Sequence, residues 1–196
     1  MNILLCTPTS VSVELCNGDA YYTEPYEIYL NNTLMKVWDR NVFSLYHLRP
    51  GETYELRVEG KKFSECVNFR TRNLKERIFQ TANDGGEVDE TAALQSAIDS
   101  LQADEFLTIC GTYKITALFL KDNVCIHLTK DSRLIGETKR EAFPILRAEE
   151  EANGVVLGTW EGEADDSFAS ILTGIGVKNV CIYGEGIIDC NAQNSD

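Results

Sequence analysis

Residues 83–98 read Asn-Asp-Gly-Gly-Glu-Val-Asp-Glu-Thr-Ala-Ala-Leu-Gln-Ser-Ala-Ile and join a glycine turn to a helix. Asp89 or Glu90 can accept hydrogen bonds from the free amides at the helix start. The apolar residues expected to form the buried stripe of this helix are Ala92, Ala93, Leu94, Ala97, Ile98 and Leu101. Short strands follow without a return to helical spacing. This order predicts a helix that covers the end of a stack of strands.

The sequence after this helix repeats itself once. Residues 123–128 (Asn-Val-Cys-Ile-His-Leu) and 179–183 (Asn-Val-Cys-Ile-Tyr) each place an Asn before an alternating Val-x-Ile strand. A polar or glycine turn then leads to a second short apolar strand, residues 133–136 in one copy and 186–189 in the other. Two similar copies with turns at matching places are typical of a solenoid. Two unrelated strands with chance similarity are the alternative.

Further short motifs accompany the repeat between residues 78 and 191. In chain order they are Asp84-Gly85-Gly86, Asp89 to Gln95, Gly111-Thr112-Tyr113, Leu118 to Lys121, Leu134-Ile135-Gly136 and Gly184 to Asp189. This collinear set resembles the opening coils of family 28 glycoside hydrolases, the polygalacturonase-like enzymes. The resemblance implies a right-handed parallel β-helix of the pectin-lyase type. Trp160-Glu161-Gly162, between the two repeat copies, is similar to the Trp/Phe-Glu-Gly loop of that family.

Residues 3–70 show strand alternation and almost no helical pattern. Residues 43–58 contain a strand, a Leu-x-Pro turn, Tyr54 and a second strand. This segment resembles the later strands of a fibronectin type III sandwich, in which the Tyr closes a corner between two sheets. Residues 26–38 read as two strands joined by an Asn31-Asn32 turn, which predicts a hairpin. A generic small β-sandwich is the alternative.

The chain is therefore expected to be mainly β and to contain two domains. Residues 1–74 are expected to form a fibronectin type III-like β-sandwich. Residues 75–196 are expected to form the first coils of a right-handed, pectin-lyase-like parallel β-helix with an N-terminal capping helix. Residues 73–80 are the predicted linker. Because 196 residues are few for a complete family 28 enzyme, the resemblance implies an amino-terminal fragment.

The family resemblance implies inverting hydrolysis of galacturonosyl bonds in pectic polysaccharide or oligogalacturonides. Such hydrolysis needs a carboxylic acid and a carboxylate base held about 6.5–9.5 Å apart. The family's Asn-Thr-Asp, Asp-Asp, Gly-His-Gly and Arg-Ile-Lys motifs do not occur here in a matching setting, since Asp165-Asp166 precedes the strand at 186–189 instead of following it. We therefore assign no catalytic residue and expect the fragment to be inactive, with its active site beyond residue 196.

Trp160 and Glu161 are the candidate substrate-binding residues. Loops inserted between solenoid strands gather on one side, and the face of a Trp can stack on a sugar ring. The structural alternative is that Trp160 covers the side of the stack. His47 and His127 are expected to be structural, and Asp189 is expected to bind turn amides. Two other functions stay open: a non-catalytic carbohydrate-binding or adhesion protein, and a β-helix polysaccharide lyase.

A net charge of −13 and a pI near 4.6 argue against a nucleic-acid partner and fit poorly with a polyanionic substrate. The basic residues of the second domain form either a solvated outer face or a basic cleft; they are Lys114, Lys121, Lys130, Arg133, Lys139, Arg140 and Arg147. Since the last coil would leave an apolar end uncovered, self-association is expected.

The seven cysteines show no metal-ligand spacing, and we expect neither a metal nor a cofactor. Cys125 and Cys181 occupy equivalent places in the two repeat copies and are expected to stack as small buried thiols. The sequence contains neither a visible signal peptide nor a membrane-spanning segment. The default compartment is therefore cytoplasmic, and secretion stays open if a leader precedes this sequence.

Overall fold

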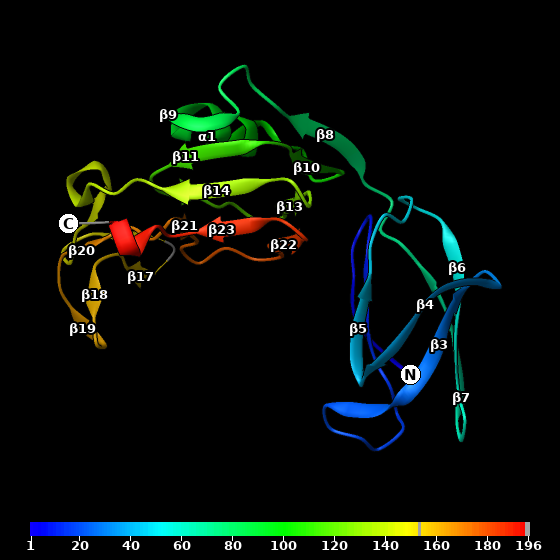
Figure 1. The fold of residues 1–196 in the computed structure, drawn as a ribbon. Coiled ribbons are helices and arrows are strands. Elements are labelled where there is room, and N and C mark those ends of the chain that lie inside the picture. Colours follow the sequence, from blue (N-terminus) through cyan, green and yellow to red (C-terminus); the bar gives the residue numbers. More distant parts are fainter. Residues whose placement is uncertain (153, 195–196) are drawn as a thin grey trace. The chain divides into compact units, whose positions relative to one another are not determined.

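The computed structural model describes residues 1–152 and 154–194 (Figure 1). Short strands dominate these residues, together with the helix α1 (Thr91–Ser100) and the 3₁₀ turns η1 (Arg140–Ala142) and η2 (Ala192–Asn194). The expectation of a mainly β protein is confirmed. The chain divides into two compact units, Met1–Lys75 and Glu76–Asp196.

The first unit contains two antiparallel sheets. The three-stranded sheet has the order β1-β2-β5, with β1 (Asn2–Cys6), β2 (Val11–Glu14) and β5 (Val42–Leu45). The four-stranded sheet has the order β4-β3-β6-β7, with β3 (Tyr22–Leu30), β4 (Thr33–Arg40), β6 (Thr53–Gly60) and β7 (Ser64–Arg70). Alternating residues of both sheets form one core, which includes Val11, Val13, Tyr26, Ile28, Phe43, Leu45, Leu56, Val58 and Phe69.

The predicted hairpin joins β3 to β4. Leu30 pairs with Thr33, and the two residues between them, Asn31 and Asn32, have φ values of 49° and 64°. Two consecutive residues with positive φ define a type I′ turn, and Asn adopts this conformation more readily than most residues. The Asn31 side chain also accepts a hydrogen bond of 2.9 Å from the backbone amide of Glu55, which fixes the turn against β6.

Tyr54 on β6 holds the turn that precedes this strand. Its hydroxyl accepts a hydrogen bond of 2.9 Å from the backbone amide of Arg49, and its ring stacks on Phe69 with 5.5 Å between centroids. Thr71, directly after β7, fastens the same turn. Its hydroxyl donates to the carbonyl of Arg49 at 2.6 Å and accepts from the amide of Glu52 at 3.0 Å. The turn is therefore bound from both neighbouring strands.

The second unit is built mainly from short parallel strands. One sheet has the order β22-β13-β10-β8, with β8 (Lys75–Phe79), β10 (Glu105–Ile109), β13 (Cys125–Leu128) and β22 (Cys181–Gly184). A second sheet has the order β23-β14-β11-β9, with β9 (Gly85–Asp89), β11 (Thr112–Ile115), β14 (Arg133–Gly136) and β23 (Ile187–Asp189) (Figure 1). Each coil contributes one strand to each sheet. Along the chain, β8 and β9 are followed by β10 and β11, then by β13 and β14, and last by β22 and β23.

A third parallel pair joins β12 (Leu118–Phe119) to β21 (Leu172–Thr173). Between the sheets lies one apolar core that includes Phe79, Leu107, Ile109, Tyr113, Ile115, Leu118, Val124, Ile126, Leu128 and Leu134. Ile182 and Ile188, on the last strand of each sheet, are partly buried against this core. Successive coils thus add their aliphatic side chains to a common interior.

The two copies of the sequence repeat lie directly on one another. Cys125 pairs with Cys181 in the parallel register. Asn123 and Asn179 precede these strands with φ values of 61° and 58°, and the amide group of Asn179 donates to Oδ1 of Asn123 at 3.0 Å. The repeated Asn thus adopts the left-handed turn conformation and binds its counterpart one coil away. Cys125 is buried but Cys181 is only partly buried, so the expected stacking has the right register and incomplete burial.

The predicted linker at residues 73–80 is largely a strand. β8 lies beside β10, and Phe79 at its end packs edge-to-face on Tyr113 with 5.0 Å between centroids. The charged residues around Arg77 suggested a linker, but an edge strand tolerates charged side chains on its solvent side. The segment without regular secondary structure shrinks to residues 71–74.

The helix α1 contributes a narrower stripe to the core than expected. Leu94, Ile98 and Leu101 are buried and Ala97 is partly buried, but Ala92 and Ala93 are exposed. Each residue turns the helix by about 100°, so residues 94, 98 and 101 share one face, while 93 lies to one side of it and 92 lies nearly opposite. The prediction of a buried stripe was therefore wrong for these two alanines.

Asp89, not Glu90, binds the amide at the start of α1. Oδ1 of Asp89 accepts hydrogen bonds from the backbone amide and the hydroxyl of Thr91, at 2.8 and 2.6 Å. Glu90 is the N-cap residue but makes no side-chain cap. Its buried carboxylate accepts instead from the side chains of Asn83 and Thr81, at 2.7 and 3.3 Å. Glu90 thus ties the glycine turn to the helix.

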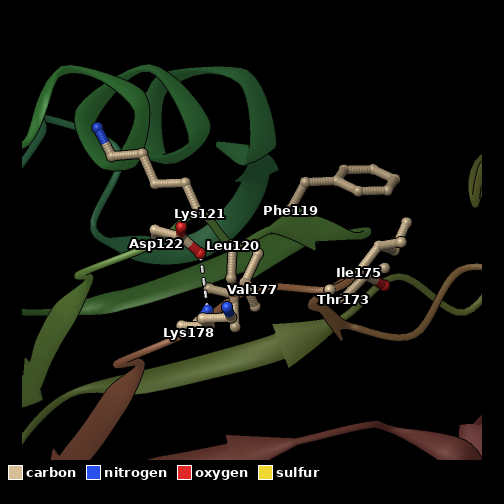
Figure 2. Close-up of a pocket in the computed structure, with 9 residues that line it drawn as sticks. Phe119, Leu120, Lys121, Asp122, Thr173, Ile175, Val177 and Lys178 are labelled. Carbon is tan, nitrogen blue, oxygen red and sulfur yellow. Dashed lines mark hydrogen bonds between the residues drawn. The ribbon is translucent and has the colours of Figure 1, made fainter. Parts of the chain in front are cut away.

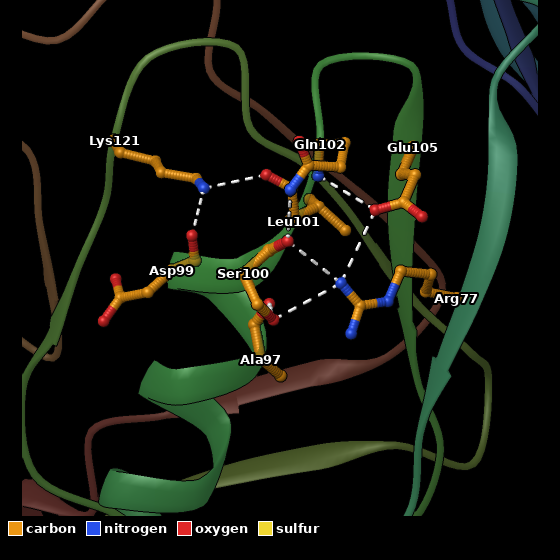
Figure 3. Close-up of polar contacts among 8 residues, drawn as sticks. All are labelled: Arg77, Ala97, Asp99, Ser100, Leu101, Gln102, Glu105 and Lys121. Carbon is orange, nitrogen blue, oxygen red and sulfur yellow. Dashed lines mark hydrogen bonds and ion pairs between the residues drawn. The ribbon is translucent and has the colours of Figure 1, made fainter.

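Two cations close the carboxyl end of α1 (Figure 3). The amine of Lys121 donates to the carbonyl oxygens of Asp99 and, at 2.8 Å, Leu101. The guanidinium of Arg77 donates to the carbonyl of Ser100 at 3.1 Å. The last carbonyls of a helix lack partners within the helix and carry partial negative charge, so nearby cations stabilise them. Lys121 is thereby committed to the helix end.

Limited trypsin digestion is expected to cut the folded chain first after Arg72 or Lys75, which flank or lie within the segment between β7 and β8. Each unit has its own core, so both fragments should keep their β-structure. Mass spectrometry of the fragments and urea unfolding of each one test this. A chain that resists cleavage there, and unfolds as one unit at every urea concentration, would contradict the boundary.

Candidate functional site

A long insertion lies between β14 and β21. It consists of short antiparallel pairs: β15 (Ile145–Leu146) with β20 (Ser167–Phe168), β16 (Glu151–Ala152) with β17 (Val155–Val156), and β18 (Thr159–Trp160) with β19 (Glu163–Ala164). Its strands β17 to β20 are labelled in Figure 1, and Trp160 is the last residue of β18. Glu161 and Gly162 connect β18 to β19 with φ values of 50° and 91°. This is again a two-residue turn with positive φ at both positions. Trp160 therefore lies directly before the turn of a hairpin.

Trp160 borders two hollows on the surface of the second unit. Its side chain is 65% exposed. The first hollow, of about 490 Å³, has mixed walls, in which aliphatic residues such as Val155, Leu157 and Leu172 alternate with polar ones such as Thr159, Ser167 and Ser170. The second, of about 500 Å³ and called here the Trp160 cavity, is lined by Arg140, Trp160, Asp165, Asp166, Ser167 and Phe168. Trp160, Ser167 and Phe168 line both hollows, so the indole stands between them.

An exposed indole beside two hollows is an arrangement that suits a ligand with an apolar ring face. Large exposed aromatic side chains in a concave surface commonly mark binding sites. Glu161, the second candidate residue, lies in the hairpin turn and lines neither hollow. The structure thus brings Trp160 to a cavity and gives Glu161 the role of a turn residue.

Asp166 is held by two donors within the insertion. Its Oδ1 accepts a hydrogen bond of 2.9 Å from the backbone amide of Ala148, and its Oδ2 pairs with the guanidinium of Arg147. The Ala148 amide, followed by Arg147, lowers the pKa of the Asp166 carboxyl below its usual range. A general acid must carry a proton at working pH. Asp166 is ionised near neutral pH and is bound to two donors. Its role is therefore to stabilise the insertion.

Asp165 has a local partner. Its Oδ1 accepts a hydrogen bond of 2.9 Å from the backbone amide of Asp166. This contact is typical of Asp in turns, where the side chain satisfies a nearby backbone donor. The Asp-Asp pair therefore fastens the segment before β20.

Arg140 and Phe168 complete the Trp160 cavity, and sequence reasoning did not single them out as site residues. The Arg140 guanidinium carbon lies 5.9 Å from the centroid of the Phe168 ring. Phe168 is 43% exposed. Phe168 could have been found as an aromatic residue within the acidic stretch of sequence between the two repeat copies. Arg140 was visible only as one member of a group of basic residues.

Three residues of that basic group, Lys114, Lys121 and Arg133, bind groups of the coils or of α1. Lys114 pairs with Glu137 at 3.4 Å, and Arg133 on β14 pairs with Asp189 on β23. Asp189 also accepts a hydrogen bond of 2.8 Å from the amide of Asn191, as expected for a turn-binding carboxylate. These contacts favour the solvated, ion-paired outer face over a basic cleft.

The histidines lie outside the Trp160 cavity. The His127 ring stacks on Tyr183 one coil away, with 4.9 Å between centroids, and its Nδ1 lies 3.4 Å from the hydroxyl of Thr108. His47 occupies a turn with φ 61°. Within residues 1–152 and 154–194, no three His, Cys, Asp or Glu side chains are grouped so as to hold a metal ion.

A third hollow, of about 750 Å³, lies beside β12 and the segment after β21 (Figure 2). Its lining includes Phe119, Lys121, Asp122, Ile175 and Lys178. Asp122 accepts a hydrogen bond of 2.7 Å from the backbone amide of Lys178, and Lys121 is bound to the end of α1. These polar groups join neighbouring coils, so the hollow is a weaker candidate for ligand binding than the Trp160 cavity.

Replacing Asp166 by Asn is expected to loosen the insertion near neutral pH. A carboxyl whose pKa is lowered in the folded state stabilises that state above its unfolded pKa of 3.8, and the stabilisation disappears as the pH falls through the folded pKa. Hydrogen exchange of residues 145–168 should therefore accelerate in Asp166→Asn near neutral pH. Asp165→Asn, which removes no ion pair, is the matched control. Equal exchange in the two variants would contradict this role.

Comparison of this chain with protein-family models, curated proteins and solved structures finds no significant match. Among the described residues, no helix has both the length and the apolar character that crossing a bilayer requires.

Proposed function

We propose that the second unit forms the opening coils of a right-handed parallel β-helix of the polygalacturonase-like kind. In-register parallel strands with a common aliphatic interior support this assignment. The Asn123–Asn179 contact between equivalent turns supports it as well. So does α1, whose apolar side chains enter the same core.

We propose further that the first unit is a fibronectin type III-like sandwich. Its two antiparallel sheets of three and four strands share one core, which suits a sandwich. The bond from the Arg49 amide to the Tyr54 hydroxyl, a few residues upstream, resembles a tyrosine corner. A generic β-sandwich would not need this contact.

The function proposed for the chain is to take part in the hydrolysis of pectic polysaccharide by a polygalacturonase-like glycoside hydrolase. The observation that carries it is the exposed indole of Trp160 between two hollows on the insertion. Sugar rings have an apolar face formed by C–H groups, and an exposed aromatic face binds it while the hydroxyl groups stay near polar residues. Trp160 and Ser167 both line the Trp160 cavity and would supply these two kinds of contact.

This chain would bind the polysaccharide and leave the acid–base chemistry to other residues. Inverting hydrolysis needs one protonated and one ionised carboxyl group on opposite sides of the sugar. Asp166 is ion-paired to Arg147, so it does not supply the protonated carboxyl group. The exposed indole of Trp160 also favours a second candidate function, a β-helix protein that binds carbohydrate without cleaving it.

The chain contains two tryptophans, Trp38 and Trp160, so replacing Trp38 allows binding to be followed by the fluorescence of Trp160 alone. In a Trp38→Phe background, Trp160 is the single indole, and its emission should change when oligogalacturonides are added. In the same titration followed by calorimetry, Trp160→Ala should bind about two- to tenfold more weakly, since stacking on an aromatic ring contributes on the order of 0.5–1.5 kcal/mol.

Trp38→Ala, in the first unit, is the matched control and should bind as the unaltered chain does. Unchanged affinity of Trp160→Ala, together with reduced stability, would leave Trp160 with only a covering role. Assay of new reducing ends in the same mixtures separates the two candidate functions. Turnover above a buffer blank that disappears in the Asp165→Asn, Asp166→Asn double variant would contradict the binding-only role of this chain.

A further inference from the structure

The net charge of this protein opposes the binding of an acidic sugar polymer. The chain carries a formal net charge of −13, which repels an anionic ligand at long range. Long-range repulsion is screened over roughly 8–10 Å at physiological salt, so a cation at the contact itself can still decide recognition. A site for a carboxylate-bearing ligand therefore needs a local cation whose donors are available.

Arg140 is such a cation. It follows β14 in the turn η1 and lines the Trp160 cavity together with Trp160, Ser167 and Phe168. It forms no ion pair with a carboxylate in residues 1–152 or 154–194. Its contact is with the face of the Phe168 ring, 5.9 Å from the centroid. Such a contact orients a guanidinium without using its hydrogen-bond donors.

The carboxylates in the same cavity are already engaged by other groups. Asp166 binds Arg147 and the Ala148 amide, and Asp165 binds the Asp166 amide. Arg147 offsets the charge of Asp166, which leaves Arg140 to offset either Asp165 or a ligand. With Arg147 counted beside the lining residues, the four groups Arg140, Arg147, Asp165 and Asp166 carry no net charge.

We propose that Arg140 is the specificity-determining residue of the Trp160 cavity and selects a sugar unit that carries a carboxylate. The guanidinium binds the carboxylate of the ligand while the indole of Trp160 stacks on the sugar ring. The planar fork of an Arg matches a carboxylate with two parallel hydrogen bonds, which a lysine cannot supply. This inference rests on the proposed carbohydrate binding and assigns the charge selectivity of that site to one residue.

Calorimetric titration of the full chain with trigalacturonate and with its methyl ester tests the proposal. The ester keeps the sugar rings and removes the negative charges. Arg140→Gln should weaken trigalacturonate binding by about tenfold, the loss expected when one charge-assisted contact is removed, and leave ester binding unchanged. Lys139→Gln is the matched control, because this neighbouring cation does not line the cavity. It should bind both ligands as the unaltered chain does.

The outcomes separate the two proposals. If Arg140→Gln binds trigalacturonate as tightly as the unaltered chain, or loses both ligands equally, Arg140 does not select charge, and the site stands so long as Trp160→Ala loses binding. If Lys139→Gln loses as much affinity as Arg140→Gln, only long-range attraction is at work and the proposal is overturned. If the unaltered chain binds neither ligand, the carbohydrate site and the inference on Arg140 fall together.

Discussion

Backbone hydrogen bonds between strands one coil apart hold the second unit in register. The amide of Cys181 donates to the carbonyl of Val124 at 2.8 Å, and the amide of Ile187 donates to the carbonyl of Ser132 at 2.9 Å. A slip of one residue would turn every inward side chain outward, so the aliphatic core and the register depend on each other. The insertion that carries Trp160 leaves and rejoins the coils at points fixed by this register.

The contributions to this register differ in size. Burial of one Leu or Ile side chain contributes about 1.5–3 kcal/mol, whereas a side-chain hydrogen bond such as Asn179 to Asn123 adds about 0.5–1.5 kcal/mol. The aliphatic interior therefore contributes most of the stability, and the Asn pair fixes the conformation of the two equivalent turns. Gly184 adds a steric condition: it has φ 128°, and a Cβ there would lie 2.0 Å from the carbonyl oxygen of Leu128. The close approach of two coils thus requires glycine at this position.

The sequence predicted the features that depend on local chemistry. The Asn31-Asn32 hairpin and the repeat at Cys125 and Cys181 were visible because turn residues and alternation are local signals. β8 was missed, since pairing with β10 is a tertiary contact that charged residues conceal. The same holds for the site. Trp160 was found as an aromatic residue in an insertion, but Arg140 and Phe168 reach it only through the pairing of β15 with β20 and the path of η1.

The stacked coils require β13 to pair in parallel with β22, and β14 with β23, one coil apart. Scalar couplings across hydrogen bonds, measured by nuclear magnetic resonance on labelled chain, test this pairing. The structure predicts a coupling from the Cys181 amide to the Val124 carbonyl and from the Ile187 amide to the Ser132 carbonyl. Couplings between β22 and β23 themselves would show that these neighbours form an antiparallel hairpin, and would contradict the stacked coils.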